Sequence, residues 1–169
     1  RRMSQIKVGD ILPKNITLMS SSNISESGAC AKPLKLESSV LHKGRVVLFA
    51  VPGAFTPTCH LNHLPEFIDK FSIFKEKGIE TIACLSTNDH FVMDAWAKSL
   101  KIPENSILML SDGNGDFVKS LGLSQDLSSN IMGPIRSQRF ALIAKDGVVE
   151  YIGVGNLDVS GAAAVLAKL

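Results

Sequence analysis

The sequence lacks a long hydrophobic run, an excess of charge of one sign and a set of closely spaced cysteines. No apolar stretch approaches the roughly 18 residues of a bilayer-spanning helix, so we do not expect a membrane protein. The 18 basic and 16 acidic side chains give a formal net charge of +2 and form no basic run, which argues against a nucleic-acid partner. The three cysteines, Cys30, Cys59 and Cys84, are too few and too widely spaced for a disulfide-stapled secreted scaffold. A reducing compartment is therefore expected, in which a thiol is either packed as a small hydrophobe or used chemically.

What is present is an alternation of strand and helix patterns over a length that predicts one domain, residues 1–169. A serine-rich loop is expected over residues 20–29, and Asp146-Gly147 predicts a tight antiparallel hairpin. Strands are expected over residues 45–51, 79–85 and 107–110, and helices over 61–74, 90–100, 117–121 and 159–169. This order predicts an α/β fold with a mixed central sheet and helices on both faces, the outline of a thioredoxin-like domain.

The segment Thr56-Pro57-Thr58-Cys59 has the features of a helix start. Pro57 suits the first helical position, which makes Thr56 the expected N-cap and Cys59 the third helical residue. The Thr56 hydroxyl is expected to meet a backbone N–H of the first turn, close to Cys59. Unpaired N–H groups and the helix dipole favour thiolate over thiol at this position. Such a sulfur can attack a peroxide oxygen if donors stabilise the leaving oxygen and bulk water is excluded.

Pro65 falls inside the same helix, where it removes one backbone hydrogen bond. A kink just past the reactive turn is expected, and it could mark a first turn that unwinds when Cys59 must meet a second thiol. An accommodated surface proline without such a use is the alternative.

The segment from Pro52 to Cys59, PGAFTPTC, matches the P-x-x-x-T-x-x-C active-site motif of peroxiredoxins, and its wording resembles the type II, or atypical two-cysteine, subfamily. Three further segments, VVLFAVPGAFTPTCHLNHLPEFI, ACLSTNDHFVMDAWAKSLKI and RFALIAKDG, extend the resemblance over residues 46–169. The resemblance implies a thioredoxin fold and a homodimer. It also implies reduction of hydrogen peroxide and alkyl hydroperoxides without a metal or organic cofactor, with recycling by thioredoxin, glutaredoxin or glutathione.

The same resemblance assigns roles to four residues. Cys59 is the peroxidatic nucleophile, Thr56 a hydrogen-bonding partner of the peroxide, and Pro52 a shield for the sulfur. The family's catalytic arginine precedes an F-A-L strand, which places it at Arg139. Independently, an arginine at the start of a buried strand needs an anionic partner, and a thiolate qualifies. A surface ion pair is the other interpretation of Arg139, and Arg136 is the competing candidate.

The thiol that resolves the Cys59 sulfenic acid is left open by the sequence. Cys30 lies in the polar segment SESGACAKP, which resembles the loop with the resolving cysteine of fungal members, where the disulfide joins two subunits. Cys84 precedes S-x-N-D, as does the second cysteine of plant members, although a strand cysteine is more often a packed hydrophobe. The vertebrate arrangement is excluded because no cysteine follows Cys84. Direct reduction by glutathione or glutaredoxin is the third possibility.

Other functions fit the sequence less well. A zinc site could use Cys59, His60 and His63, but a fourth ligand is missing and His60 should point away from Cys59. A dithiol oxidoreductase needs C-x-x-C, and here Thr56 occupies the first cysteine position. A cysteine hydrolase would need a histidine base that the sequence does not place. A redox relay or holdase would use the same thiol without peroxidase turnover.

The expected compartment is cytoplasmic or peroxisomal. Ala167-Lys168-Leu169 nearly matches the Ser-Lys-Leu peroxisomal address, but it also continues the apolar pattern of the preceding helix. Arg1-Arg2 before Met3 could be a cloning remnant or the end of a removed presequence, in which case a mitochondrial location is the alternative.

Overall fold

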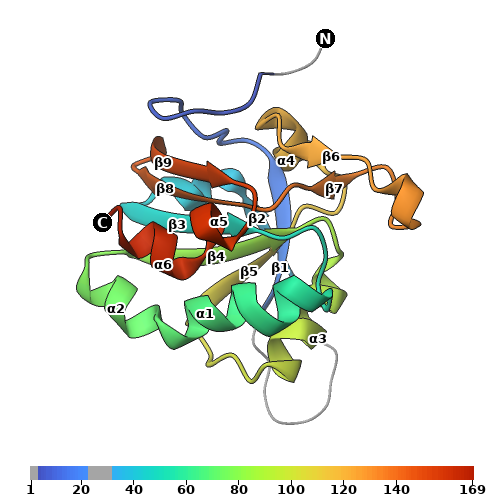
Figure 1. Cartoon of the computed structure of the whole chain (residues 1–169), viewed down its shortest axis with the longest axis horizontal. Coiled ribbons are helices and arrows are strands. Elements are labelled where there is room, and N and C mark those ends of the chain that lie inside the picture. The colour runs from blue at the N-terminus through green and yellow to red at the C-terminus, as the bar shows by residue number, and fades with distance from the viewer. Residues whose placement is uncertain (1–3, 23–31) are drawn as a thin grey trace.

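The computed structural model describes residues 4–22 and 32–169, which form a central sheet covered by helices on both faces (Figure 1). The sheet has seven strands in the order β2-β1-β5-β4-β3-β8-β9. Strands β3, β4 and β5 run parallel, while β2, β8 and β9 pair antiparallel to their neighbours and β1 pairs antiparallel to both β2 and β5. This mixed sheet confirms the predicted thioredoxin-like α/β class.

The strands and helices have the following bounds. The strands of the central sheet are β1 (Thr17–Ser22), β2 (Lys32–Glu37), β3 (Arg45–Ala50), β4 (Thr81–Ser86), β5 (Ile107–Ser111), β8 (Phe140–Lys145) and β9 (Val148–Val154), and β6 (Ser124–Gln125) pairs with β7 (Arg136–Ser137). The α-helices are α1 (Leu64–Asp69), α2 (Phe71–Glu76), α3 (His90–Ser99), α4 (Asp116–Ser120), α5 (Leu157–Ser160) and α6 (Ala162–Leu166). The 3-10 helices are η1 (Ser38–His42) and η3 (Ser128–Asn130), and η2 (Cys59–His63) is a π-helix.

Strand β3 explains how the sheet separates two cores. Successive residues of a strand face opposite sides, and β3 is apolar on both of them. Val46 and Leu48 join the cluster that includes α4, whereas Val47 and Phe49 join the cluster that includes α1, α2, α3 and α6. The second cluster also contains Cys59, so the candidate thiol is part of a helix-covered core.

Several predicted elements are confirmed with small shifts of their ends. The strands β4 and β5 and the helices α3 and α4 occupy their expected segments. Asp146 and Gly147 both have positive φ, 49° and 87°, as the predicted two-residue hairpin between β8 and β9 requires. No helix in the described part of the chain is long and apolar enough to span a bilayer.

Three predictions of local structure differ from the structure in part. The predicted loop at residues 20–29 begins as the end of β1, where the Ser20 hydroxyl donates to the Met109 carbonyl at 2.7 Å, and residues 23–31 lie outside the described chain. The expected helix over 61–74 is split at Lys70 into α1 and α2, because apolar spacing reports the buried face and not the break. The expected C-terminal helix is interrupted at Gly161, where a Cβ atom would lie 2.6 Å from the Leu157 carbonyl oxygen.

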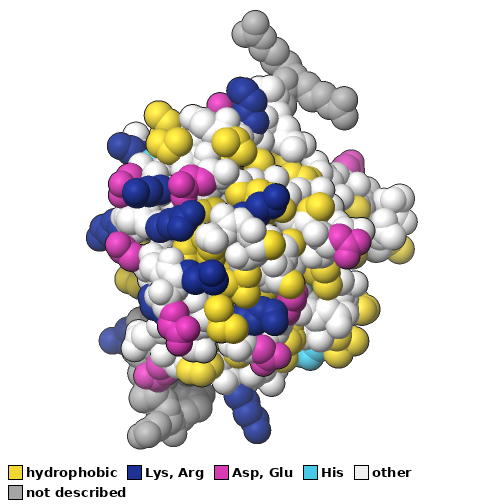
Figure 2. All heavy atoms as spheres, turned by 60° about the vertical axis from the view of Figure 1, so that its left-hand side comes forward, with side chains coloured by type: hydrophobic (Ala, Val, Ile, Leu, Met, Phe, Trp, Pro, Cys, Tyr) yellow, Lys and Arg dark blue, Asp and Glu magenta, His cyan; other side chains and the backbone are white. Residues whose placement is uncertain are grey.

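Two surface features bear on the predicted partners and compartment. Acidic and basic side chains are interspersed on the face shown in Figure 2. At the C-terminal end, Leu169 packs against the core cluster that contains Cys59, and the Lys168 ammonium lies 5.6 Å from the centre of the Tyr151 ring. Within the tripeptide Ala167–Leu169, Leu169 is thus partly buried, whereas Ala167 and Lys168 are exposed.

Candidate active site

The loops that follow two parallel strands, β3 and β4, meet at one edge of the sheet and shape the candidate site. Side chains that follow parallel strands collect at this edge. Asn88, after β4, accepts a hydrogen bond from the Ala54 amide at 2.9 Å. Arg136 donates to the Pro52 carbonyl at 3.2 Å and to Asn88 Oδ1 at 3.5 Å, and Phe55 is held at a φ of 63°. The Pro52–Phe55 loop is thus fixed from outside, with one residue in a conformation rare for a non-glycine side chain.

The helix begins at Pro57, as expected, but the Thr56 side chain does not cap it. The His60 amide donates to the Thr56 carbonyl at 2.8 Å, which makes Thr56 the first backbone acceptor of the helix. The Thr56 hydroxyl instead donates to the Gly53 carbonyl at 2.7 Å. The predicted side-chain cap is wrong because this reverse contact within the tight loop uses the hydroxyl proton. The lone pairs of the oxygen are left to accept a hydrogen bond from a bound molecule.

The helix runs through a π-helical turn at Cys59. The Leu64 amide donates to the Cys59 carbonyl, five residues back, and Pro65 follows at once. Because Pro65 has no N–H, the hydrogen-bond pattern is interrupted where it returns to the α-helical spacing. The irregular hydrogen bonding thus lies over Cys59–His63, directly before Pro65, and the kink expected at Pro65 stays a prediction.

Cys59 and Arg139 are in direct contact. The thiol is completely buried, and Arg139 Nη2 donates to Cys59 Sγ at 2.9 Å from its position directly before β8. Among the described residues, Arg139 makes no salt bridge with a carboxylate. The alternative of a surface ion pair does not describe it, and its charge is directed at the sulfur. Arg136, the competing candidate, contacts the loop backbone instead.

A buried histidine that sequence reasoning had considered only as a metal ligand completes the arrangement. His63 has no exposed surface, and its Nδ1 accepts from Arg139 Nη1 at 2.8 Å. Its Nε2 lies 2.8 Å from the Ser160 carbonyl oxygen. Burial, more than any other effect, lowers the pKa of His63 to about 4, so the ring is neutral at physiological pH. The four-residue spacing from Cys59, which places both side chains on one helix face, was the available signal.

The guanidinium between Cys59 and His63 bears on the predicted absence of a metal. It occupies the position that a cation shared by these two side chains would take. His60 is turned elsewhere and accepts a hydrogen bond from Trp96 Nε1 at 3.0 Å. Over residues 4–22 and 32–169, no group of three or more histidine, cysteine or acidic side chains is placed to hold a metal ion.

Of the two candidate resolving thiols, the structure describes only Cys84. Cys84 is completely buried on β4, next to Phe49 of β3, and burial raises its pKa well above the ordinary value. The charge of Cys59 raises the pKa of Cys84 further, whereas Arg139 lowers it. In the folded domain Cys84 is therefore a protonated, packed thiol. Cys30 lies outside the described residues.

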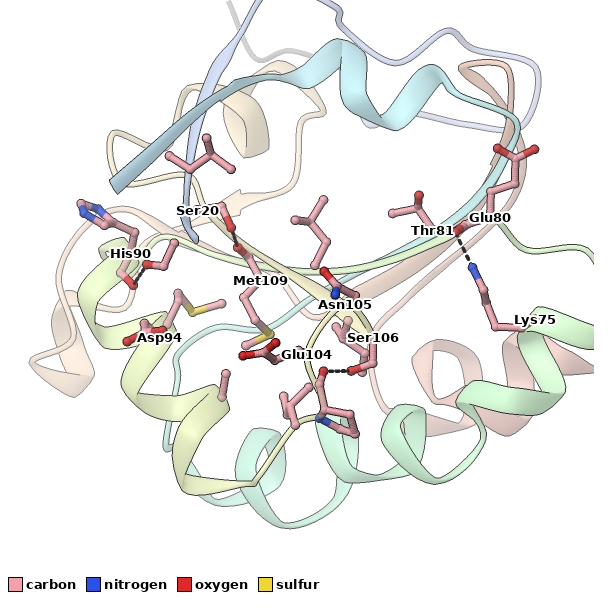
Figure 3. Close-up of a pocket in the computed structure, with 18 residues that line it drawn as sticks. Ser20, Lys75, Glu80, Thr81, His90, Asp94, Glu104, Asn105, Ser106 and Met109 are labelled. Atoms are coloured by element: carbon pink, nitrogen blue, oxygen red, sulfur yellow. Dashed lines mark hydrogen bonds between the residues drawn. The ribbon is translucent and has the colours of Figure 1, made fainter. Parts of the chain in front are cut away.

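A cavity of about 590 Å³ lies apart from this arrangement, between α3, β5 and the segment that joins them (Figure 3). Three of its polar side chains donate hydrogen bonds to backbone carbonyls. The Ser20 hydroxyl donates to the Met109 carbonyl, the Lys75 ammonium to the Glu80 carbonyl and the Ser106 hydroxyl to the Pro103 carbonyl. Neither Cys59 nor Arg139 lines this cavity, so we place the candidate site at the buried thiol.

The fold and the buried thiol define a class of protein. On a thioredoxin-like sheet, a single cysteine in the first turn of a helix contacts an arginine, and a threonine stands where dithiol oxidoreductases have their first cysteine. The class is that of thioredoxin-like proteins with one arginine-contacted cysteine at the helix start.

Comparison with known proteins makes the assignment narrower. The sequence model of the Redoxin family matches residues 7–166. The chain is 39% identical to peroxiredoxin-2B of Arabidopsis thaliana over 171 residues, which covers 99% of this chain and 100% of the relative. It is 44% identical to chloroplastic peroxiredoxin-2E of the same plant over 160 residues, or 94% of this chain and 64% of the relative. The chain belongs to the Redoxin family and, within it, to the peroxiredoxins of the type II group.

Comparison with solved structures agrees with the assignment to the peroxiredoxins. The crystal structure of reduced Prx3 from Vibrio vulnificus in complex with hydrogen peroxide superposes with a TM-score of 0.83 at 40% identity, covering 96% of this chain and 95% of the other. Two of the curated plant relatives are considerably longer, since the chain spans 64% of the Arabidopsis peroxiredoxin-2E and 52% of the rice peroxiredoxin-2E-2.

Proposed function

We propose that this protein is a thiol peroxidase that reduces hydrogen peroxide and alkyl hydroperoxides at Cys59. The observation that carries the proposal is the 2.9 Å contact between Arg139 Nη2 and Cys59 Sγ in a buried setting. A guanidinium is charged at every accessible pH, so it favours the thiolate and can also stabilise negative charge on a peroxide oxygen. The peroxide bound to the Vibrio neighbour supports this substrate class.

The reaction needs only the electron pair of the sulfur. The Cys59 thiolate attacks one oxygen of the hydroperoxide, and the S–O bond forms as the O–O bond breaks. The leaving oxygen departs with the electrons of that bond and takes up a proton, which gives water or an alcohol. Cys59 is left as the sulfenic acid. No metal or organic cofactor takes part, and an external thiol supplies the reducing equivalents.

Thr56 and Pro52 complete the proposed substrate site. The hydroxyl proton of Thr56 is committed to the Gly53 carbonyl, so its oxygen can accept the O–H of a hydroperoxide while Arg139 donates to the peroxide oxygens. Pro52 lies two residues after the end of β3 with its carbonyl held by Arg136, and we assign its ring the role of shielding the sulfur from water.

Recycling begins when a second thiol attacks the sulfenic acid, which forms a disulfide and releases water. Cys84 can act only after local opening, because its folded environment keeps it protonated and packed. The π-turn at Cys59, which Pro65 interrupts, is the part of the helix best suited to such opening. There are two other routes: Cys30 of a second subunit attacks the sulfenic acid, or glutathione or glutaredoxin reduces it directly. Where a disulfide between two cysteines forms, thioredoxin is the alternative reductant.

One experiment selects the route. The protein is treated with one equivalent of peroxide, and the products are identified by non-reducing mass spectrometry in the Cys30→Ser and Cys84→Ser variants. A Cys30 to Cys59 bond between chains, a Cys59 to Cys84 bond within one chain and a persistent sulfenic acid each identify one scheme.

The central test of the function is Cys59→Ser, with Cys84→Ser as the matched control in the same core. We expect Cys59→Ser to abolish peroxide consumption, while Cys84→Ser keeps the first oxidation of Cys59 intact. Retention of most activity in Cys59→Ser would overturn the proposal. Rapid Cys59 oxidation without turnover, whichever reductant is added, would indicate a redox relay or holdase instead.

The assembly and compartment belong to the same proposal. We propose a homodimer, with thioredoxin or glutaredoxin as the redox partner. The names of the relatives include chloroplastic proteins, so the family does not fix one compartment. Our proposal of a cytoplasmic or peroxisomal location is tested by imaging a fluorescent fusion that keeps Lys168 and Leu169 against one in which both are deleted.

A further inference from the structure

His63 is buried beside the reactive cysteine and does not touch the sulfur. It contacts Arg139 Nη1 through Nδ1 and the Ser160 carbonyl through Nε2, both at 2.8 Å. A carbonyl oxygen only accepts, so Nε2 must carry the ring proton and donate to Ser160. A guanidinium only donates, so Nδ1 must be the lone pair that receives Arg139. The contacts alone therefore define a neutral ring with one tautomer.

The position of this ring is fixed on every side. Phe49 and Phe67 pack against it, with ring centroids 5.0 and 5.6 Å away. Ser160, at the end of α5, is itself held, since its hydroxyl lies 2.9 Å from the Asn156 carbonyl oxygen and 3.1 Å from that of Gly155. The Nδ1 lone pair consequently points in one direction, toward Arg139.

We propose that His63 is a positioning residue that holds the Arg139 guanidinium so that its second nitrogen faces Cys59 Sγ. The proposal rests on the thiol peroxidase function and adds a residue to it. Arg139 has a long side chain with several rotatable bonds, and no carboxylate among the described residues fixes it. An acceptor on Nη1 leaves Nη2 free to donate to the sulfur at 2.9 Å and to the peroxide. A neutral acceptor does this without neutralising the positive charge that the reaction uses.

The same contacts exclude His63 as a general base for Cys59. Both ring nitrogens are engaged, one by Ser160 and the other by Arg139. The low pKa of the ring, about 4, agrees with a group that takes up no proton at neutral pH. His63 therefore acts through Arg139.

The test compares His63→Leu with His63→Asn, two side chains of nearly equal size and shape. Neither keeps a ring N–H for Ser160, but the Asn amide oxygen lies near the position of Nδ1 and can accept from Arg139, whereas Leu cannot. The second-order rate of Cys59 oxidation by hydrogen peroxide is measured by stopped flow. We expect a loss of about 10²-fold in His63→Leu, because a displaced catalytic group costs on that order, and recovery of most of the rate in His63→Asn. Equal loss in both variants would show that the tie to Ser160, a structural role, is what matters.

A double-mutant cycle with Arg139→Ala separates positioning from stability. If His63 acts through Arg139, His63→Leu causes little further loss in the Arg139→Ala background. A full additional loss there would overturn the proposal. Circular dichroism at the assay temperature verifies that each variant is folded.

A readout without peroxide keeps this proposal distinct from the proposed function. In a background without Cys30 and Cys84, the pH dependence of Cys59 alkylation by iodoacetamide follows thiolate formation. We expect the half-maximal pH to rise in His63→Leu and to stay near the parent value in His63→Asn. If the parent did not consume peroxide while this pattern held, the peroxidase function would fail and the positioning role would stand. An unchanged half-maximal pH in His63→Leu would refute the positioning role.

Discussion

At the scale of single residues, two arginines close together in the sequence have different tasks. Arg136, in β7, donates through Nε to the Met132 carbonyl at 2.8 Å and through Nη1 to the Pro52 carbonyl at 3.2 Å. Arg139 reaches the thiol. Arg136 belongs to the small β6–β7 sheet, whereas Arg139 directly precedes β8 of the central sheet. One arginine therefore shapes the loop of the site, and the other is available for its chemistry.

We predict that Arg139→Ala slows the oxidation of Cys59 by peroxide by about 10²-fold to 10³-fold, on the scale of removing one donor to a developing oxyanion. Arg136→Ala is the matched control, because it removes the same kind of side chain from the neighbouring strand β7. It should act mainly on peroxide affinity by loosening the Pro52–Phe55 loop. Stopped-flow rates over a range of peroxide concentrations check both variants. A larger loss of the limiting rate in Arg136→Ala would reverse the two assignments.

His63 gives a prediction for stability. Burial lowers its pKa in the folded chain from the ordinary 6.5 to about 4. Between these values the unfolded chain binds the proton and the folded chain does not, so stability falls as the pH falls. The stabilisation is complete above pH 6.5, and on the order of 2 kcal/mol of it is lost between pH 7 and pH 5. Urea unfolding at the two pH values should show this loss in the wild type and a smaller loss in His63→Asn. Equal pH dependence in both proteins would contradict the assignment.

The part of the site that sequence could predict is the part that depends on local geometry. Pro57 and Thr56 place the helix start, and with it Cys59 in the first turn. The contact of Arg139 with the sulfur agrees with the expectation that this arginine needs an anionic partner. The role of His63 could not be predicted, because it depends on a guanidinium from β8 and a carbonyl from α5 that only the tertiary fold brings together.

At the scale of elements, the C-terminal segment is fixed to the helix that carries the reactive cysteine. Glu66 of α1 accepts from the amides of Ala162 and Ala163, each at 3.0 Å, at the start of α6. His63 lies one helical turn before Glu66, and the Ser160 carbonyl accepts a hydrogen bond from its Nε2. A carboxylate at a helix start satisfies unpaired amides and interacts favourably with the dipole. These contacts make α5 and α6 part of the support of the site.

We predict that Glu66→Ala destabilises the fold by about 1–2 kcal/mol, as the loss of a helix cap does, and that it loosens α6. Glu66→Gln is the control, since its amide oxygen can retain one of the two acceptor contacts. Hydrogen exchange followed by mass spectrometry should show faster exchange over residues 157–166 in Glu66→Ala than in Glu66→Gln. If exchange over residues 157–166 is the same in Glu66→Ala and the wild type, Glu66 does not stabilise the start of α6.

The elements that the sequence could not predict are those whose bounds depend on contacts with other parts of the fold. Strand β1 is polar near its end, because Ser20 turns inward to a carbonyl of β5 instead of following an apolar alternation. The break at Gly161 comes from a close approach of the chain to Leu157 and Glu66. By contrast, β3 and the β8–β9 hairpin were predictable, since an apolar run and an Asp-Gly turn act within a few residues.

At the scale of the whole molecule, exposed apolar side chains lie on both loops that flank the site. Phe55 is 48% exposed, and Ile131, next to Met132 of the facing loop, is 95% exposed. A Cβ atom at Gly53 would lie 3.5 Å from the Met132 side chain, so these two loops adjoin. Ile131 also has a φ of 56°, which is rare for a β-branched residue. We therefore propose this surface, with its strained and almost fully exposed isoleucine, as the contact of the proposed dimer.

We predict that Ile131→Asp weakens the proposed dimer and leaves the subunit folded. Aspartate tolerates the left-handed region better than isoleucine, so the substitution relieves backbone strain while it places a charge in the proposed interface. Val8→Asp is the control, because Val8 is 59% exposed and belongs to neither loop of the site. Sedimentation velocity at equal concentration should give a dimer for the wild type and Val8→Asp, and a shift toward monomer for Ile131→Asp. If the wild type sediments as a monomer, or if Ile131→Asp stays fully dimeric, this surface is not the interface, and the exposure of Phe55 and Ile131 needs another explanation.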